Sequence, residues 1–378
     1  MNINPYLKLM ADKGASDLFF TTGAPVSMKI EGDTKAVGKS PLEAGMVKHI
    51  AESIMTDDQK EEFAHELEMN LGMSLPGIGR YRINIYLQRG EVSMVIRYIK
   101  ADIPTMDQLT LPEKLKDLIL QKKGLILVVG STGSGKSTTL ASLIKYRSET
   151  VTGHILTIED PIEFAFRHSR SIIGQREVGL DTRSYSNALR EAMREAPDVI
   201  MIGEARDEET MKAALSYADT GHLCLTTLHA VNANQTLDRV LSFFRNDSSD
   251  QVLMDMSLNL RAIVSQRLIQ ARDGKRVAAI EILVNTPYIS ELIRKGEFGE
   301  IKEVMEKGAT EGMQTFDQSL YELFKKGKID LKAALNNADS RSNLEWRINF
   351  GGEKEIDKGK GSEEMDFPSS MDDLPNVD

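Results

Sequence analysis

Residues 130–138 read Gly-Ser-Thr-Gly-Ser-Gly-Lys-Ser-Thr and stand between the apolar residues 125–129 and residues 139–145, whose leucines and isoleucine keep helical spacing. A strand, a glycine loop and a helix in this order form a phosphate-binding loop (P-loop), because the backbone N–H groups of the loop and of the helix N-terminus converge on an anion. A chance glycine turn would need neither the lysine nor the flanking elements. The run therefore predicts a nucleotide-binding site.

The residue types in this loop match distinct chemical tasks. The glycines allow the backbone to curl around a triphosphate where a Cβ would clash. Lys136 can reach the β and γ phosphates of ATP, and the Ser137 hydroxyl can join the shell of a Mg²⁺ ion. The predicted nucleotide-binding residues are Gly130, Ser131, Thr132, Gly133, Ser134, Gly135, Lys136, Ser137 and Thr138.

A metal-holding acid is predicted at the end of another apolar run. Residues 199–204, Val-Ile-Met-Ile-Gly-Glu, have the form of a Walker B strand, although Glu204 stands where an aspartate is usual. Its longer side chain can bind Mg²⁺ through a water molecule. We expect Glu204 to be a catalytic, metal-holding acid; the alternative is an acid exposed to solvent at a strand end.

Three carboxylates gather within residues 157–164, just past the predicted strand 154–158. Loops that leave the carboxyl ends of strands in open α/β sheets surround the ligand crevice, so at least one of these acids should face the γ-phosphate. Glu163 is predicted to orient or deprotonate the attacking water, with Glu159 and Asp160 in supporting roles. An acidic turn exposed to solvent is the alternative.

His222 and His229 stand at the two ends of the predicted strand 223–227. In an extended segment they lie on the order of 20 Å apart, so they cannot both touch one phosphate. One of them can sense the nucleotide while the other passes its state to a neighbouring subunit or domain. A purely structural histidine is the alternative, more so for His222 than for His229.

Composition limits the classes of partner. The chain has 378 residues and a net charge of −10, but its last 28 residues hold nine acids and three lysines, which leaves 44 basic and 48 acidic residues in the body. This near balance predicts no nucleic-acid partner. No apolar run approaches the roughly 20 residues of a membrane span, so a cytoplasmic protein without direct membrane insertion is expected. The single cysteine, Cys224, is expected to be a buried structural thiol.

The pattern of elements predicts an α/β protein with two domains. We expect a small α/β domain over residues 1–100, a linker over 101–112, an α/β domain with a parallel sheet over 113–350 and a disordered acidic tail over 351–378. Helices are expected over 185–196 and 250–270, each with an apolar stripe in the core.

Arginines cluster in the predicted strands 79–86 and 93–99. Arg80 and Arg82 share one face of the first strand, opposite Tyr81, and Arg97 lies in the second. They are either ordinary solvated side chains or arginine fingers that reach a nucleotide phosphate, of the same or of a neighbouring subunit.

The four motifs in this order resemble the secretion-type motor ATPases of type IV pilus and type II secretion systems, over about residues 3–345. Residues 285–294 and 312–317 are similar to the PilT/PilU family of retraction ATPases. Ser290 stands where PilT motors carry an arginine, and this departure, like the acidic tail, agrees with the PilU branch. Extension ATPases usually carry a tetracysteine zinc motif, which one cysteine cannot form.

The resemblance implies a PAS-like N-terminal domain and a RecA-like P-loop ATPase domain in a homo-hexameric ring. It implies ATP hydrolysis with Mg²⁺, action at the cytoplasmic face of the inner membrane on the pilus platform protein, and a PilT-like partner ATPase. Arg80, Arg82 and Arg97 match family arginines that approach nucleotide. Ser290 also favours an alternative, a nucleotide-binding adaptor that stacks on the partner motor and hydrolyses little ATP itself.

Overall fold

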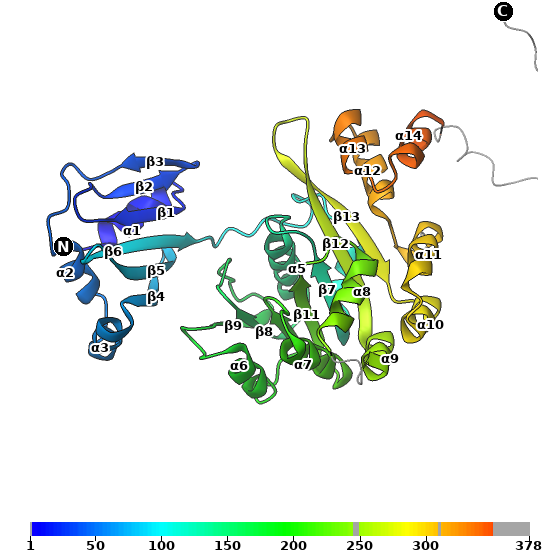
Figure 1. Cartoon of the computed structure of the whole chain (residues 1–378), viewed down its shortest axis with the longest axis horizontal. Coiled ribbons are helices and arrows are strands. Elements are labelled where there is room, and N and C mark those ends of the chain that lie inside the picture. Colours follow the sequence, from blue (N-terminus) through cyan, green and yellow to red (C-terminus); the bar gives the residue numbers. More distant parts are fainter. Residues whose placement is uncertain (1, 245–248, 309–310, 351–378) are drawn as a thin grey trace, which may run out of the picture.

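A computed structural model describes residues 2–244, 249–308 and 311–350 of the chain, and the predicted acidic tail lies outside them. Two β-sheets from separate parts of the chain organise these residues, as Figure 1 shows. The α/β class is confirmed. One sheet lies within residues 17–99 and the other within residues 124–284.

The first sheet is antiparallel throughout, with strand order β3-β2-β1-β6-β5-β4. Its strands are β1 (Asp17–Phe20), β2 (Ser27–Ile30), β3 (Asp33–Ala36), β4 (Glu68–Leu75), β5 (Gly79–Gln88) and β6 (Glu91–Ile99). Three helices accompany it: α1 (Asn4–Asp12), α2 (Met46–Glu52) and α3 (Asp57–Glu66). Thr56 caps the N-terminus of α3: its side chain accepts a hydrogen bond from the Gln59 N–H in a capping box.

Alternation along β5 sets which side chains face which way. Tyr81, Ile83 and Ile85 are fully buried in the hydrophobic cluster of this part of the chain. Arg80 and Arg82 therefore project from the opposite face of the strand, as the period of two predicts. The first sheet thus presents two arginines on the side away from its own core.

The second sheet is parallel except for one edge, with strand order β13-β12-β7-β11-β10-β8-β9. Its strands are β7 (Gly124–Val129), β8 (Gly153–Glu159), β9 (Ser171–Glu177), β10 (Val199–Ile202), β11 (Leu223–Leu228), β12 (Leu260–Gln270) and β13 (Arg276–Val284). Only β13 runs antiparallel, against β12. The central strands are buried on both faces, as their continuous apolar runs predict.

Helices cover both faces of the second sheet. Alternate residues of β7 join different clusters: Ile126 and Val128 pack with Leu140 of α5, whereas Leu125 and Leu127 pack with the helices that follow β9. The first face carries α4 (Lys114–Ile119) and α5 (Lys136–Thr150). The second carries α6 (Tyr185–Ala192), α7 (Glu208–Asp219), α8 (Ala233–Ser242), α9 (Ser249–Asn259), α10 (Pro287–Lys295), η2 (Phe298–Glu300) and α11 (Ile301–Lys307). A separate cluster joins α12 (Phe316–Lys325), α13 (Leu331–Asn337) and α14 (Arg341–Phe350) to β12 and β13.

The helix expected over residues 250–270 is wrong in its second half. The chain is helical only to Asn259 and continues as β12, which pairs with β7 on one side and β13 on the other. Residues 262–266 are all buried, and β-branched Ile263 and Val264 suit a strand enclosed by two neighbours. Burial on both faces therefore outweighs the helical spacing of the same residues.

The helix expected over residues 185–196 ends early, at Ala192. Pro197 disfavours the helical conformation in the residue before it, and Ala196 has φ +48°. Leu189 and Ala192 are buried as expected, but Met193 is 45% exposed. Met193 is therefore not a core residue.

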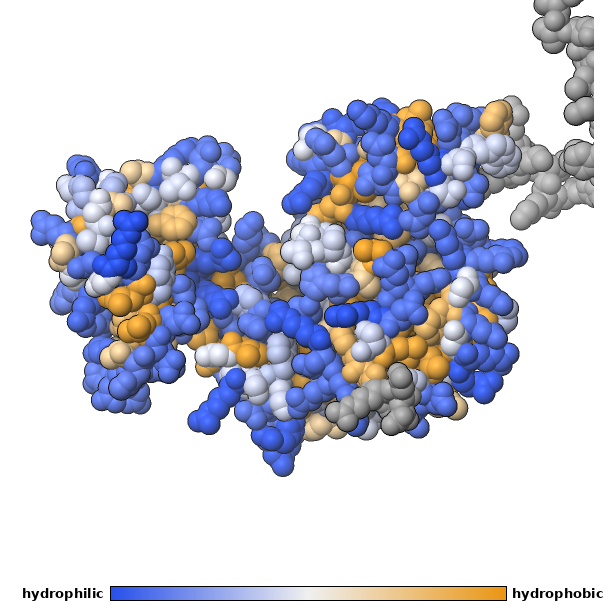
Figure 2. All heavy atoms as spheres, in the orientation of Figure 1, coloured by the Kyte–Doolittle hydropathy of each residue, from blue (hydrophilic) through white to orange (hydrophobic). Residues whose placement is uncertain are grey.

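The surface is mostly polar. Figure 2 shows hydrophilic side chains over most of the visible face of both parts, with apolar residues in small groups. Within the described residues, no helix is both long and apolar enough to cross a membrane.

Candidate nucleotide-binding site

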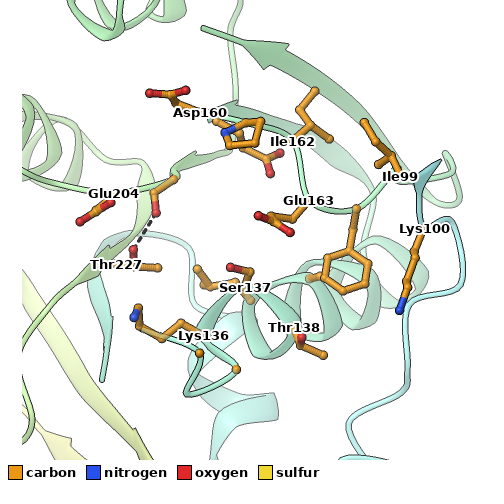
Figure 3. A pocket seen from close by; sticks show the side chains of 18 of the residues that line it. Ile99, Lys100, Lys136, Ser137, Thr138, Asp160, Ile162, Glu163, Glu204 and Thr227 are labelled. Atoms are coloured by element: carbon orange, nitrogen blue, oxygen red, sulfur yellow. Dashed lines mark hydrogen bonds between the residues drawn. The ribbon is translucent and has the colours of Figure 1, made fainter. Parts of the chain in front are cut away.

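A cavity of about 740 Å³ lies at the carboxyl ends of the parallel strands, where α5 begins. Residues after β7, β8, β10 and β11 meet at this edge because the four strands run in the same direction. Figure 3 shows Lys136 and Ser137 at the start of α5, with Glu163 and Glu204 on the facing walls. Residues of the first sheet, Asp17 among them, complete the lining.

The P-loop leads into α5, as its sequence predicts. From this loop, Thr132, Gly133, Gly135, Lys136, Ser137 and Thr138 line the cavity, whereas Gly130, Ser131 and Ser134 are not among the lining residues. The Lys136 Nζ donates hydrogen bonds to the carbonyl oxygens of Gly130 (2.7 Å) and Ser131 (3.0 Å). Burial lowers the pKa of Lys136, and the nearby Glu204 carboxylate opposes that shift. The amine is thus held within the loop, beside the cavity.

Gln266 of β12 supports the P-loop through two side-chain hydrogen bonds. This residue was not predicted from the sequence. Its Nε2 donates to the Ser134 carbonyl (2.7 Å), and its Oε1 accepts from the Thr139 hydroxyl (2.7 Å). A Cβ at Gly135, which has φ +89°, would lie 2.7 Å from Gln266 Nε2. The need for glycine at this position therefore comes from β12 as well as from a ligand. The expectation of a helix over 250–270 concealed Gln266.

Glu204 lies just past β10 and is held by two side chains. Its carboxylate accepts a hydrogen bond from Arg206 Nε (2.8 Å) and lies 3.0 Å from His229 Nε2. Only 19% of the Glu204 side chain is exposed. The position of Arg206, two residues past the predicted strand-end acid, is the sequence signal by which this second missed residue could have been found. Glu204 and His229, predicted from separate motifs, are direct partners.

The three acids after β8 occupy different environments. Glu159 is 7% exposed and accepts hydrogen bonds from the Thr157 hydroxyl (2.7 Å) and Gln175 Nε2 (3.2 Å). Burial raises the pKa of Glu159 to about 6, although these hydrogen bonds oppose the shift. Asp160 is partly exposed and lies 3.8 Å from Arg206. All three line the cavity, and the Glu163 carboxylate points into it toward Ser137 (Figure 3).

The two predicted histidines are separated as expected. His229 follows the carboxyl end of β11 and lines the cavity, whereas His222 precedes the strand and does not. The His222 Nδ1 lies 3.2 Å from the Thr220 hydroxyl and 3.3 Å from the Tyr217 carbonyl oxygen. Between them, Cys224 is fully buried, and burial raises the pKa of its thiol. The expectation of a buried thiol is confirmed.

Two of the three predicted arginines line the cavity. Arg82 and Arg97 contribute to the lining, and Arg80 does not. Each has an acidic partner: Arg80 lies 3.5 Å from Asp181, Arg82 lies 3.6 Å from Glu177, and Arg97 lies 2.9 Å from Asp17. Two of these pairs join the first sheet to the loop region at the end of β9.

The oxygen ligands at the cavity fit a Mg²⁺ ion bound together with phosphates. The Ser137 hydroxyl and the Glu204 carboxylate both line the cavity, and hard oxygen donors are what Mg²⁺ prefers. No group of three or more His, Cys, Asp or Glu side chains among residues 2–244, 249–308 and 311–350 is arranged to hold a metal by itself.

Comparisons with known proteins identify the family. The model of the family "Type II/IV secretion system protein" matches residues 2–336. The type IV pilus ATPase PilU of Pseudomonas aeruginosa is 50% identical over 94% of this chain and 94% of its own length. The type IV pilus retractation ATPase PilT of that organism is 40% identical over 91% of this chain and 100% of its own. A solved structure of the pilus retraction motor PilT with bound ADP matches with a TM-score of 0.83 and 40% identity, over 91% of this chain and 99% of that one. The chain therefore belongs to the Type II/IV secretion system protein family.

Proposed function

We propose that this protein is an ATP-hydrolysing motor subunit that drives retraction of type IV pili, and hence twitching motility. The observation that carries the proposal is the convergence of Glu163 and Glu204, from the ends of two different strands, on one cavity with Lys136 and Ser137. A P-loop alone binds nucleotide. Two carboxylates facing it supply the groups that hydrolysis needs.

In this proposal, each group at the cavity has a task. The P-loop N–H groups and Lys136 bind the β and γ phosphates, and Lys136 exchanges its two loop carbonyl partners for phosphate oxygens. The Glu163 carboxylate points into the cavity, so it orients the attacking water and accepts its proton. His229 and Arg206 hold the Glu204 carboxylate in place. A Mg²⁺ ion bound near Ser137 and Glu204 would neutralise charge on the phosphates.

The quaternary arrangement is also a proposal. Residues 1–100 form a PAS-like domain, residues 101–112 a linker and residues 113–350 a RecA-like ATPase domain. Six copies form a ring at the cytoplasmic face of the inner membrane, where the ring engages the pilus platform protein and a PilT-like partner ATPase. The relatives named PilU and PilT support this proposal. Arg80, Arg82 and Arg97 then lie near a nucleotide at the junction of domains.

A second function, a nucleotide-binding adaptor for the partner motor, is favoured by Ser290. The Ser290 hydroxyl donates a hydrogen bond to the Ser257 carbonyl oxygen (2.7 Å), so it ties α10 to α9 within one chain. An arginine at this position would instead extend a charged side chain from α10. The adaptor would bind ATP at the same cavity and strengthen the partner motor while hydrolysing little ATP itself.

Steady-state ATPase activity of the purified chain, with and without a PilT-like partner, separates the two functions. For a motor subunit, Glu163→Gln lowers turnover by at least about 100-fold while nucleotide still binds. Glu149→Gln is the matched control, because Glu149 is exposed on α5 and does not line the cavity. Turnover that stays low in the wild-type chain alone and rises in the partner when the chain is added supports the adaptor. Wild-type turnover in Glu163→Gln refutes the site.

A further inference from the structure

Glu177 lies at the point where the first sheet meets the loop that carries Glu163. It is the last residue of β9, is 1% exposed and pairs in register with Glu159 of β8. One carboxylate oxygen, Oε2, accepts a hydrogen bond from the Ile162 N–H at 3.3 Å. The other, Oε1, makes no hydrogen bond with any described residue and lies 3.6 Å from Arg82 Nε. A single buried side chain therefore touches both parts of the protein.

The contact with Ile162 matters because Glu163 is the next residue. Ile162 is itself buried, so close packing holds its backbone against the Glu177 carboxylate. On the other side of Glu163, Phe164 forms a β-bridge with Lys100, and the Ala165 N–H donates to the Lys100 carbonyl at 3.0 Å. The loop that carries Glu163 is thus fastened at both ends to groups that connect with the first sheet.

Among the described residues, Arg82 is the only cation in direct contact with Glu177. Burial raises the pKa of Glu177, and the hydrogen bond from Ile162 and the charges of Arg82 and Arg80 oppose that rise. Arg82 also faces Arg97 across the β5–β6 pair, where two like charges repel. Pairing of Arg82 with Glu177, and of Arg97 with Asp17, relieves this repulsion. The Arg82 side chain is therefore drawn toward Glu177.

We propose that Glu177 is a positioning residue that links the placement of the first sheet, through Arg82, to the placement of the Glu163 carboxylate, through Ile162. When the first sheet moves relative to the second, the Arg82–Glu177 pair shifts or breaks, and the Glu163 loop shifts with it. The orientation of the N-terminal part then sets the rate of hydrolysis. This inference rests on the proposed role of Glu163, and it gives a route by which movement controls chemistry within one chain.

The test is a double-substitution cycle on the full-length chain. Glu177→Gln keeps an oxygen that can accept from Ile162 but removes the charge that pairs with Arg82, and Arg82→Gln removes the other half of the pair. Each is expected to lower kcat, measured per nucleotide-binding site, by about tenfold with KM within about twofold, because a small displacement of a catalytic group lowers the rate without removing binding. The double variant should also lose about tenfold, since both changes break one link.

Independent roles give a different result. If Arg82 acts by itself on a phosphate and Glu177 only supports the fold, the two losses multiply to about 100-fold in the double variant, and the proposal is overturned. Arg176→Gln is the matched control: Arg176 is the neighbouring residue of β9, its side chain pairs with Glu195 at 2.7 Å, and it makes no hydrogen bond or ion pair with residues 160–165. It is expected to keep wild-type kcat. A loss in Arg176→Gln equal to that in Glu177→Gln would also overturn the proposal.

Hydrogen exchange of the segment 160–165 provides a readout besides activity. Arg82→Gln should speed exchange at the Ile162 N–H, and Arg176→Gln should not. If Glu177→Gln does not fold, Arg82→Gln decides alone: wild-type kcat and unchanged exchange in that variant would contradict the link. Failure of the proposed function is distinguishable, because Glu163→Gln would then keep its activity. If Glu163→Gln is inactive while Arg82→Gln and Glu177→Gln are both fully active, only the link is wrong.

Discussion

The buried Glu159 carboxyl makes the stability of this protein depend on pH in an unusual direction. Its pKa is about 6 in the folded chain against an ordinary value of 4.5, because burial disfavours the charged form. The folded state therefore holds this proton to higher pH than the unfolded state does. Below pH 4.5 both states are protonated, and the carboxyl has no pH-dependent cost. As pH rises through 4.5 toward and past 6, the unfolded state ionises first, and stability is lost.

The size of the effect follows from the shift. A difference of about 1.5 in pKa corresponds to about 2 kcal/mol of the free energy of unfolding at pH 8, and to about 0.8 kcal/mol at pH 5. Glu159→Gln removes the ionisable group but keeps an oxygen that can accept from Thr157 and Gln175. The variant should therefore gain about 2 kcal/mol at pH 8 relative to the wild type. For a cooperative unit of roughly 150–250 residues, this raises the unfolding midpoint by about 4–8 °C.

Thermal unfolding of both chains at pH 5 and pH 8 measures this gain, followed by circular dichroism and without nucleotide. The comparison cancels the titration of every other group that the two chains share. Glu149→Gln serves as the control, since that carboxylate is exposed on α5 and its replacement should leave the midpoint nearly unchanged at either pH. A Glu159→Gln midpoint that exceeds the wild type equally at both pH values, or more at pH 5, would refute the reasoning.

Three further predictions concern side chains in or next to strands β11 and β12. Gln266→Leu removes both hydrogen bonds that support the P-loop and is expected to lower stability by about 2–3 kcal/mol and weaken nucleotide binding, measured by chemical denaturation and by fluorescent nucleotide titration. His229→Ala frees one oxygen of Glu204 and is expected to lower kcat by about tenfold with little change in KM; an equal loss in His65→Ala, an exposed histidine on α3, would show that the effect is not local. Cys224 should not react with a thiol reagent in the folded chain but should react fully in denaturant, and fast reaction in native buffer would contradict its burial.

The motifs in the sequence located the cavity because their chemistry is local. Each motif follows an apolar run: the P-loop, the two acidic segments and His229. Parallel strands bring the segments at their carboxyl ends to one edge of a sheet. The strands predicted over 125–129, 154–158, 199–202 and 223–227 are confirmed, with each end within one residue of the observed one. Their continuous apolar runs indicate burial on both faces, which is typical of a parallel sheet.

Features that depend on contacts between distant segments could not be predicted in the same way. Strand β9 is an edge strand with polar residues such as Gln175 and Glu177, so its sequence carries no strong strand signal. Residues 260–270 have apolar spacing that fits a helix, and only pairing with β7 and β13 makes them a strand. For this reason Gln266 and Glu177, which act across the fold, were missed, whereas Lys136 and Glu204 were found.

The cavity lies between two parts of the protein that have separate hydrophobic clusters. Asp17 and Arg97 line it from one part, and Lys136 and Glu204 line it from the other. Each part has its own buried core, and packed cores resist deformation, so the width of the cavity changes with the angle between the two parts. A ligand that binds most tightly at one angle favours that angle. By the same factor, a force that favours that angle raises the affinity of the cavity for the ligand. A force on the N-terminal part and a change in nucleotide concentration therefore shift the same equilibrium between angles of the two parts.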